Sequence, residues 1–225
     1  MERSHRWTQI ERIDPLGVNQ QAQLPYGLKA DEVVAAMNDV IELLYDLNLF
    51  LVNRGNLRLQ EMILGNSFSG IVSEFLVQAV DRASETLVRN SQIGGHPDLV
   101  PTDMYANDRV LHGAEGVEVK TSLQSGGWQG HNPEKVWILV FQYSIDILTQ
   151  PIQDRAPFRF EKAMAALLEE SDWSFSGRTG ASRRTPTASI LKAGTAKLHQ
   201  NFIYERPGYV RARRRTPGGA PSEQG

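Results

Sequence analysis

The stretch GGHPDLVPTDMYANDRVLHGAEGVEVK, residues 94–120, contains two short β-branched runs separated by a polar loop. Asp98 stands at the start of the first run, and Glu118 and Lys120 lie two positions apart in the second. Alternate side chains of an extended strand share a face, so we expect Glu118 and Lys120 to point together while the valines of that run point into the core. A hairpin joining the two runs would bring Asp98 beside Glu118. Two carboxylates and one ammonium group around one point suit a hard divalent cation and a phosphate group.

Helices are expected before this stretch. Asp31 can cap a helix over about residues 31–52, whose apolar positions follow helical spacing and which Gly55 can end. A second helix is expected from near Ser67 or Ser69, with an apolar arc that runs to Leu87. Residues 1–27 are polar and interrupted by Pro and Gly, which predicts an irregular lead-in.

Strands are expected within and after residues 94–120. The runs DLVP, GVEVKTS and VWILVFQYSI predict strands, and the last is apolar almost throughout, as a central strand covered on both faces would be. FRFEKAMAALLEESDW is ambiguous, because its Ala, Leu and Glu content favours a helix while its apolar spacing also fits a strand. We expect a strand that ends before Asp172. TPTASI predicts another short strand and GTAKLHQNFIY a short helix. The result is an α/β fold with a mixed β-sheet flanked by helices.

Composition sets further bounds. The chain has 225 residues, of which 40% are hydrophobic and 22% charged, typical of one globular domain. It has no cysteine, which excludes disulfides and thiolate metal sites. No secretory signal and no membrane-spanning stretch is visible, so we expect a cytoplasmic protein with no membrane partner. The formal net charge is −2, but residues 178–215 contain ten Lys and Arg against one acid, which predicts a basic surface.

Pro97-Asp98 followed by Glu118-Val119-Lys120 resembles the PD-(D/E)xK motif of the restriction-endonuclease-like nuclease superfamily. The expected order of helix, three-stranded meander, helix and strand over about residues 67–146 is also similar to that family's core. The resemblance implies that Asp98 and Glu118 bind Mg²⁺ and that Lys120 assists the attacking water. It also implies a restriction-endonuclease-like core.

The resemblance is greatest to type II restriction endonucleases, which implies a homodimer acting on double-stranded DNA at a short specific sequence. The long helix over 31–52 could supply a dimer surface, although an ordinary core-facing helix explains it equally well. Two alternatives stay open: a repair, phage or recombination nuclease of the same fold without strict specificity, and a non-catalytic DNA-binding protein.

The expected organisation is a single nuclease domain over residues 1–210. Within it we expect an N-terminal helical part at 28–90, a catalytic core at 91–150 and a DNA-contacting part at 151–210. Residues 211–225, after the domain, are expected to form a disordered basic tail.

Further site residues are candidates. Glu74 on the second helix could add a carboxylate to the metal site, although it lies outside the apolar arc and a solvated glutamate is as good an interpretation. The loop after the ExK strand could contact DNA through Trp128, Gln129, His131 and Asn132. The alternative for that loop is a turn with its tryptophan packed on the core. A Gly- and Ser-rich segment offers phosphate or guanine contacts from Arg178, Arg183 and Arg184.

Overall fold

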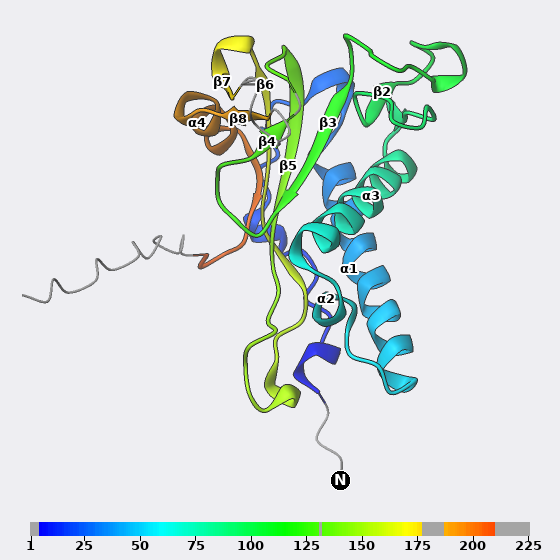
Figure 1. The fold of residues 1–225 in the computed structure, drawn as a ribbon, viewed down its shortest axis with the longest axis vertical. Helices are drawn as coiled ribbons and strands as arrows, with labels where there is room; N and C mark the ends of the chain where they lie inside the picture. The colour runs from blue at the N-terminus through cyan, green and yellow to red at the C-terminus, as the bar shows by residue number, and fades with distance from the viewer. Residues whose placement is uncertain (1–4, 131, 177–186, 210–225) are drawn as a thin grey trace, which may run out of the picture.

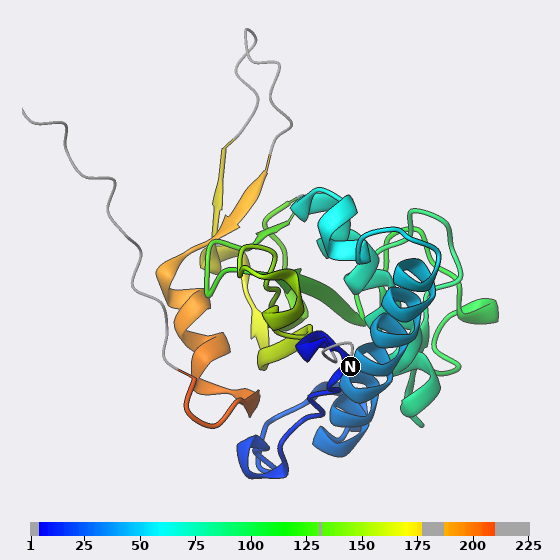
Figure 2. The ribbon, with the colours of Figure 1, turned by 90° about the horizontal axis from the view of Figure 1, so that it is seen from below.

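The computed structural model describes residues 5–130, 132–176 and 187–209, and Figures 1 and 2 show it from two directions. The helices are α1 to α4, at Ala30–Asn53, Leu59–Met62, Gly65–Ala83 and Lys192–Gln200. The strands are β1 to β9, at Leu87–Arg89, Leu99–Pro101, Val117–Ser122, Gln129–Gly130, Val136–Ser144, Arg159–Leu168, Trp173–Phe175, Ala188–Ile190 and Phe202–Glu205. Short 3₁₀ helices η1 to η6 lie at Arg6–Thr8, Pro15–Gly17, Pro25–Gly27, Ala106–Asp108, Ile152–Asp154 and Glu170–Asp172.

A six-stranded mixed sheet, in the order β1-β2-β3-β5-β6-β9, forms the centre of the molecule. Its strands pair antiparallel except β3 and β5, which are parallel from Val117 opposite Trp137 to Ser122 opposite Gln142. A small second sheet has the order β4-β8-β7. The predicted α/β class and the mixed sheet flanked by helices are therefore confirmed. A helix followed by a three-stranded meander, β1-β2-β3, is present, and the described residues between β3 and β5 contain the short strand β4. These elements alone do not establish a restriction-endonuclease-like core.

The central sheet is covered on both faces, as Figure 1 shows, by α1 and α3 on one side and by α4 with the small sheet on the other. Alternation along β5 explains this, because Leu139 and Phe141 join the cluster under α1 and α3 while Ile138 and Val140 join the cluster under α4. All four side chains are fully buried. The prediction of a central strand buried on both faces is confirmed.

Two sequence predictions need correction. The second helix ends at Ala83 rather than reaching Leu87, because Ser84 Oγ accepts the backbone N–H groups of Thr86 and Leu87 and turns the chain into β1. The expected helix over GTAKLHQNFIY holds only to Gln200, after which β9 pairs antiparallel with β6. The ambiguous segment is a strand, β6, as expected. Among the described residues no helix has the length and apolar character needed to cross a membrane.

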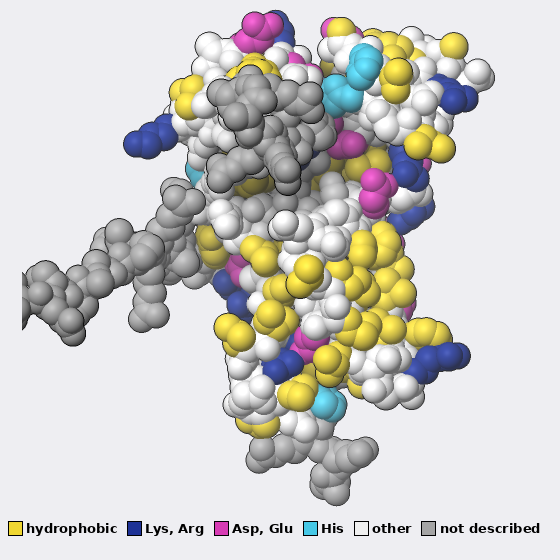
Figure 3. Space-filling view, in the orientation of Figure 1, with side chains coloured by type: hydrophobic (Ala, Val, Ile, Leu, Met, Phe, Trp, Pro, Cys, Tyr) yellow, Lys and Arg dark blue, Asp and Glu magenta, His cyan; other side chains and the backbone are white. Residues whose placement is uncertain are grey.

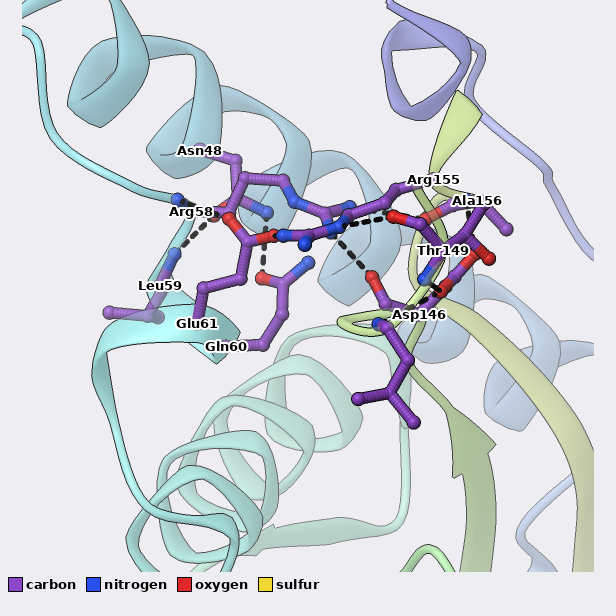
Figure 4. Close-up of polar contacts among 10 residues, drawn as sticks. Asn48, Arg58, Leu59, Gln60, Glu61, Asp146, Thr149, Arg155 and Ala156 are labelled. Atoms are coloured by element: carbon purple, nitrogen blue, oxygen red, sulfur yellow. Dashed lines mark hydrogen bonds and ion pairs between the residues drawn. The ribbon is translucent and has the colours of Figure 1, made fainter. Parts of the chain in front are cut away.

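A buried polar network joins α1, α2 and the loop that follows β5 (Figure 4). Arg58 is 1% exposed and donates to the carbonyl oxygens of Asp146 at 2.6 Å and Ala156 at 3.1 Å, and to Glu61 Oε1 at 2.8 Å. Arg155 pairs with the same Glu61 oxygen. Figure 1 shows α2 and this loop at the end of the molecule opposite β2. The network therefore stabilises the end of the fold that lies away from β2.

Candidate active site

Asp98 lies beside the start of β3, as the sequence predicts. β2 pairs antiparallel with β3 through Leu99 and Val117, so the residue before β2 comes to lie next to the residue after Val117. Asp98 Oδ2 accepts a hydrogen bond of 2.8 Å from the backbone N–H of Val119. Gly116 allows this approach: its φ is +144°, and a Cβ there would lie 2.3 Å from Pro97 Cγ and 2.4 Å from the carbonyl oxygen of Leu99.

Glu118 and Lys120 share one face of β3. The strand alternates as expected, with Val117 and Val119 buried in the core on the opposite face. Lys120 Nζ donates a short hydrogen bond to Glu118 Oε1. The Glu118 side chain is only 12% exposed and that of Lys120 is 23% exposed, so this ion pair lies in a partly enclosed place rather than on an open surface.

His96 belongs to the same cluster, although the sequence favours a simple turn histidine. Its Nδ1 lies 2.9 Å from Glu118 Oε2, and its Nε2 lies 3.1 Å from Glu134 Oε2. Glu134 precedes β5, and the parallel pairing of β3 with β5 brings the beginnings of both strands together. Figure 3 shows histidine and acidic side chains around the hollow at the top of the molecule. The adjacency of His96 to Pro97-Asp98 is the only sequence signal that could have found this residue, and nothing in the sequence marks Glu134.

The segment that carries Asp98 is held by one buried amide. Asn90 Nδ2 donates to the carbonyl oxygens of Pro97 at 3.0 Å and Val110 at 2.8 Å, while its Oδ1 accepts the backbone N–H groups of Gln92 and Val110. The backbone N–H of Asn90 also donates to the carbonyl oxygen of Asp98. This single side chain thus ties the residue before Asp98 to Val110 in the polar loop and helps to set where Asp98 enters the cluster.

The carboxyl groups of the cluster have opposite pKa shifts. Burial, and next the charge of Glu118, raises the pKa of Asp98 to about 7, although the Val119 N–H and Lys120 oppose the rise. Burial also opposes ionisation of Glu118, but hydrogen bonds from His96 and Lys120 prevail and lower its pKa to about 2. Hydrogen bonds to Glu118 and Glu134 outweigh burial and raise the pKa of His96 to about 10. Near neutral pH, Asp98 is therefore a partly protonated acid that an additional cation would ionise.

The donor set fits a hard divalent cation. Mg²⁺ is usually held by one or two carboxylates and keeps several waters, and Asp98 and Glu118 supply two carboxylates whose mutual repulsion a cation would relieve. Within residues 5–130, 132–176 and 187–209, no three His, Asp or Glu side chains gather in a metal-binding arrangement. A cation here would thus have these two protein carboxylates, with water or substrate oxygens completing its shell.

The other predicted site residues lie elsewhere. The exposed carboxylate of Glu74 pairs with Arg89 at 2.9 Å, which agrees with the interpretation as a solvated glutamate. Trp128 is 5% exposed and packs in the core cluster under α4, so its ring is not available to a base, and the alternative of a tryptophan packed on the core applies. Gln129 and Asn132 are exposed. His131, Arg178, Arg183 and Arg184 lie outside the described residues, as does the tail 211–225.

Two cations of the basic segment are already paired in the described part of the chain. Lys197 Nζ contacts Asp172, and Arg206 Nε lies 2.6 Å from Glu161. The basic surface expected for residues 178–215 is therefore partly neutralised from within. The helix α1 turns its apolar residues to the core, which accounts for its pattern without a partner, and the homodimer stays a prediction.

No protein-family model matches the chain, and no curated protein matches its sequence. Function must therefore be inferred from the cluster formed by Asp98, Glu118, Lys120, His96 and Glu134.

Proposed function

We propose that the protein is a Mg²⁺-dependent endonuclease that hydrolyses phosphodiester bonds of double-stranded DNA, and that it acts at a specific sequence as type II restriction endonucleases of the PD-(D/E)xK type do. The observation that carries the proposal is the convergence of Asp98 with the Glu118–Lys120 pair, with the Val119 N–H bonded to Asp98 at 2.8 Å. Only the residue types and the spacing of this cluster support the family. DNA binding, metal binding and the homodimer are parts of the proposal.

Each side chain has a role in this proposal. Asp98 and Glu118 would hold the cation, which when bound neutralises phosphate charge and makes water more acidic. Lys120 extends from the same face of β3 as Glu118 and carries N–H donors that can orient a water molecule or contact a phosphate oxygen. The partial enclosure of Glu118 and Lys120 strengthens these charge interactions relative to bulk water.

A non-catalytic DNA-binding protein is the alternative from another class. In that case the Glu118–Lys120 pair would serve only as an ion pair. The position of Asp98 beside Glu118 and Lys120, together with its raised pKa, favours the enzyme, because buried carboxylates held beside another negative charge gather at functional sites.

The test is digestion of unmethylated plasmid and phage DNAs with and without Mg²⁺. Discrete and reproducible bands support a sequence-specific enzyme, whereas a smear or trimming from ends would indicate a nuclease without strict specificity. Lys120→Ala should reduce the cleavage rate by about 10²–10⁴-fold while DNA binding and the unfolding transition are retained. Lys29→Ala is the matched control, because Lys29 is an exposed lysine paired with Glu85 and makes no contact with the cluster. If the wild type cleaves no DNA with any divalent cation, the enzyme proposal is wrong.

A further inference from the structure

The Glu118 carboxylate is fixed on both oxygens. Lys120 Nζ donates to Oε1, and His96 Nδ1 lies 2.9 Å from Oε2. The terminal torsion of a glutamate is broad, so a carboxylate held on one oxygen only can rotate away from its place. A carboxylate has about four lone-pair sites, and these two partners use two of them, which leaves sites free for a cation.

His96 is itself held from two directions. Its backbone N–H donates to the carbonyl oxygen of Leu111 at 3.0 Å, and its own carbonyl oxygen accepts the Gly113 N–H at 2.7 Å. Its ring reaches Glu134 through Nε2 at 3.1 Å. The backbone bonds fix where the residue lies, and beside the bond of Nδ1 to Glu118, the contact of Nε2 with Glu134 fixes how the ring is turned among the described residues. The Glu134 side chain is 33% exposed, so without this contact it would be an ordinary carboxylate at the protein surface.

We propose that Glu134 and His96 are positioning residues of the nuclease site: Glu134 orients the His96 ring, and the ring holds Glu118 in the orientation in which Glu118 and Asp98 receive the cation. This inference rests on the proposed function and assigns residues outside the PD-(D/E)xK motif. It follows the general behaviour of metal sites, in which groups that orient the ligands affect affinity by about 10–100-fold when they are removed. Neither residue contacts the reacting atoms in this proposal.

The effect of Glu134 must pass through His96, and this gives a sharp test. We would measure the binding of Mn²⁺ alone by calorimetry, and the Mg²⁺ concentration that half-saturates DNA cleavage, for Glu134→Gln, His96→Gln and the double variant. Each single variant should weaken Mn²⁺ binding and raise the half-saturating Mg²⁺ concentration by about tenfold or more, while the cleavage rate at saturating Mg²⁺ changes much less. The double variant should equal His96→Gln alone, since two residues that act in series are not additive.

Glu170→Gln is the matched control, because Glu170 is an exposed glutamate in η6 and the substitution removes the same charge. It should leave Mn²⁺ binding and the Mg²⁺ requirement unchanged. Unchanged or tighter Mn²⁺ binding in Glu134→Gln, or additive effects in the double variant, would overturn the inference. Glu134→Gln removes no backbone contact, so it decides the matter even if His96→Gln fails to fold.

Asp98→Ala separates this inference from the proposed function. If Asp98→Ala abolishes Mn²⁺ binding and Glu134→Gln has no effect, only the role of Glu134 and His96 is wrong. If Mn²⁺ binding does not depend on Asp98 at all, the proposed site is wrong, and the inference is wrong with it.

Discussion

Asp98→Asn should make the protein more stable above neutral pH while abolishing cleavage. Burial and the charge of Glu118 raise the pKa of Asp98 from 3.8 to about 7. The folded state therefore holds the Asp98 proton more tightly than the unfolded state does. Stability falls as pH rises from about 4 to 7, and above pH 7 the ionised carboxylate lowers stability by its full amount.

The size of the effect follows from the shift. At about 1.4 kcal/mol per pH unit, the interval from 3.8 to about 7 corresponds to an upper bound of roughly 4 kcal/mol at pH 8. Asparagine keeps an oxygen that can accept the Val119 N–H, so most of the geometry is preserved. Because Asp98 and Glu118 interact and the site can relax, we expect a gain of about 1–3 kcal/mol at pH 8.

The assay is urea unfolding of wild type and Asp98→Asn at pH 8 and at about pH 4.5. Near pH 4.5 the wild-type Asp98 is protonated in the folded state, so the gain should fall below about 1 kcal/mol. Asp154→Asn, at an exposed aspartate of η5, makes the same change as a control. The reasoning is refuted if Asp98→Asn is no more stable than wild type at pH 8, or if its gain is equal at both pH values.

Three further predictions concern the site and its supports. Mg²⁺ should raise the unfolding temperature more at pH 8 than at pH 5, since Asp98 must lose its proton to bind a cation; an equal rise by scanning fluorimetry would contradict this. Gly116→Ala should lower the free energy of unfolding by roughly 1–3 kcal/mol and reduce cleavage, because the new methyl group would clash with Pro97 and Leu99. Unchanged urea unfolding would contradict this clash. Arg58→Ala should lower the free energy of unfolding by about 3–5 kcal/mol in urea, because it removes a buried partner of Glu61, and the Mg²⁺ dependence of any proposed cleavage by the folded fraction should stay as in wild type.

The sequence predicts those parts of the molecule that depend on local pattern. The strand alternation of Val117 to Lys120 and the antiparallel meeting of β2 and β3 follow from short-range rules, so the approach of Asp98 to Glu118 could be predicted. The long helix and the buried β5 were likewise visible as periodicity or as a continuous apolar run.

Other parts depend on contacts that no local pattern contains. β6 is buried on both faces, so its Ala- and Leu-rich composition favours a helix while its apolar spacing favours the strand that forms; its place between β5 and β9 is what no local pattern contains. β9 pairs antiparallel with the edge of β6, and this pairing ends the last helix earlier than the sequence predicts. The contact between His96 and Glu134 depends on the parallel pairing of β3 and β5, which no local pattern contains.

The hydrogen bonds of the Asn90 amide bear on which substitutions the neighbouring loop can accept during evolution. Because the Asn90 amide ties Pro97 to Val110, it helps to place Asp98 without using the side chain of Met104, which lies elsewhere in the loop between β2 and β3. The Met104 side chain is exposed. Substitutions at such exposed positions can accumulate without moving the acid, so this part of the loop surface can diversify while Asp98 keeps its place.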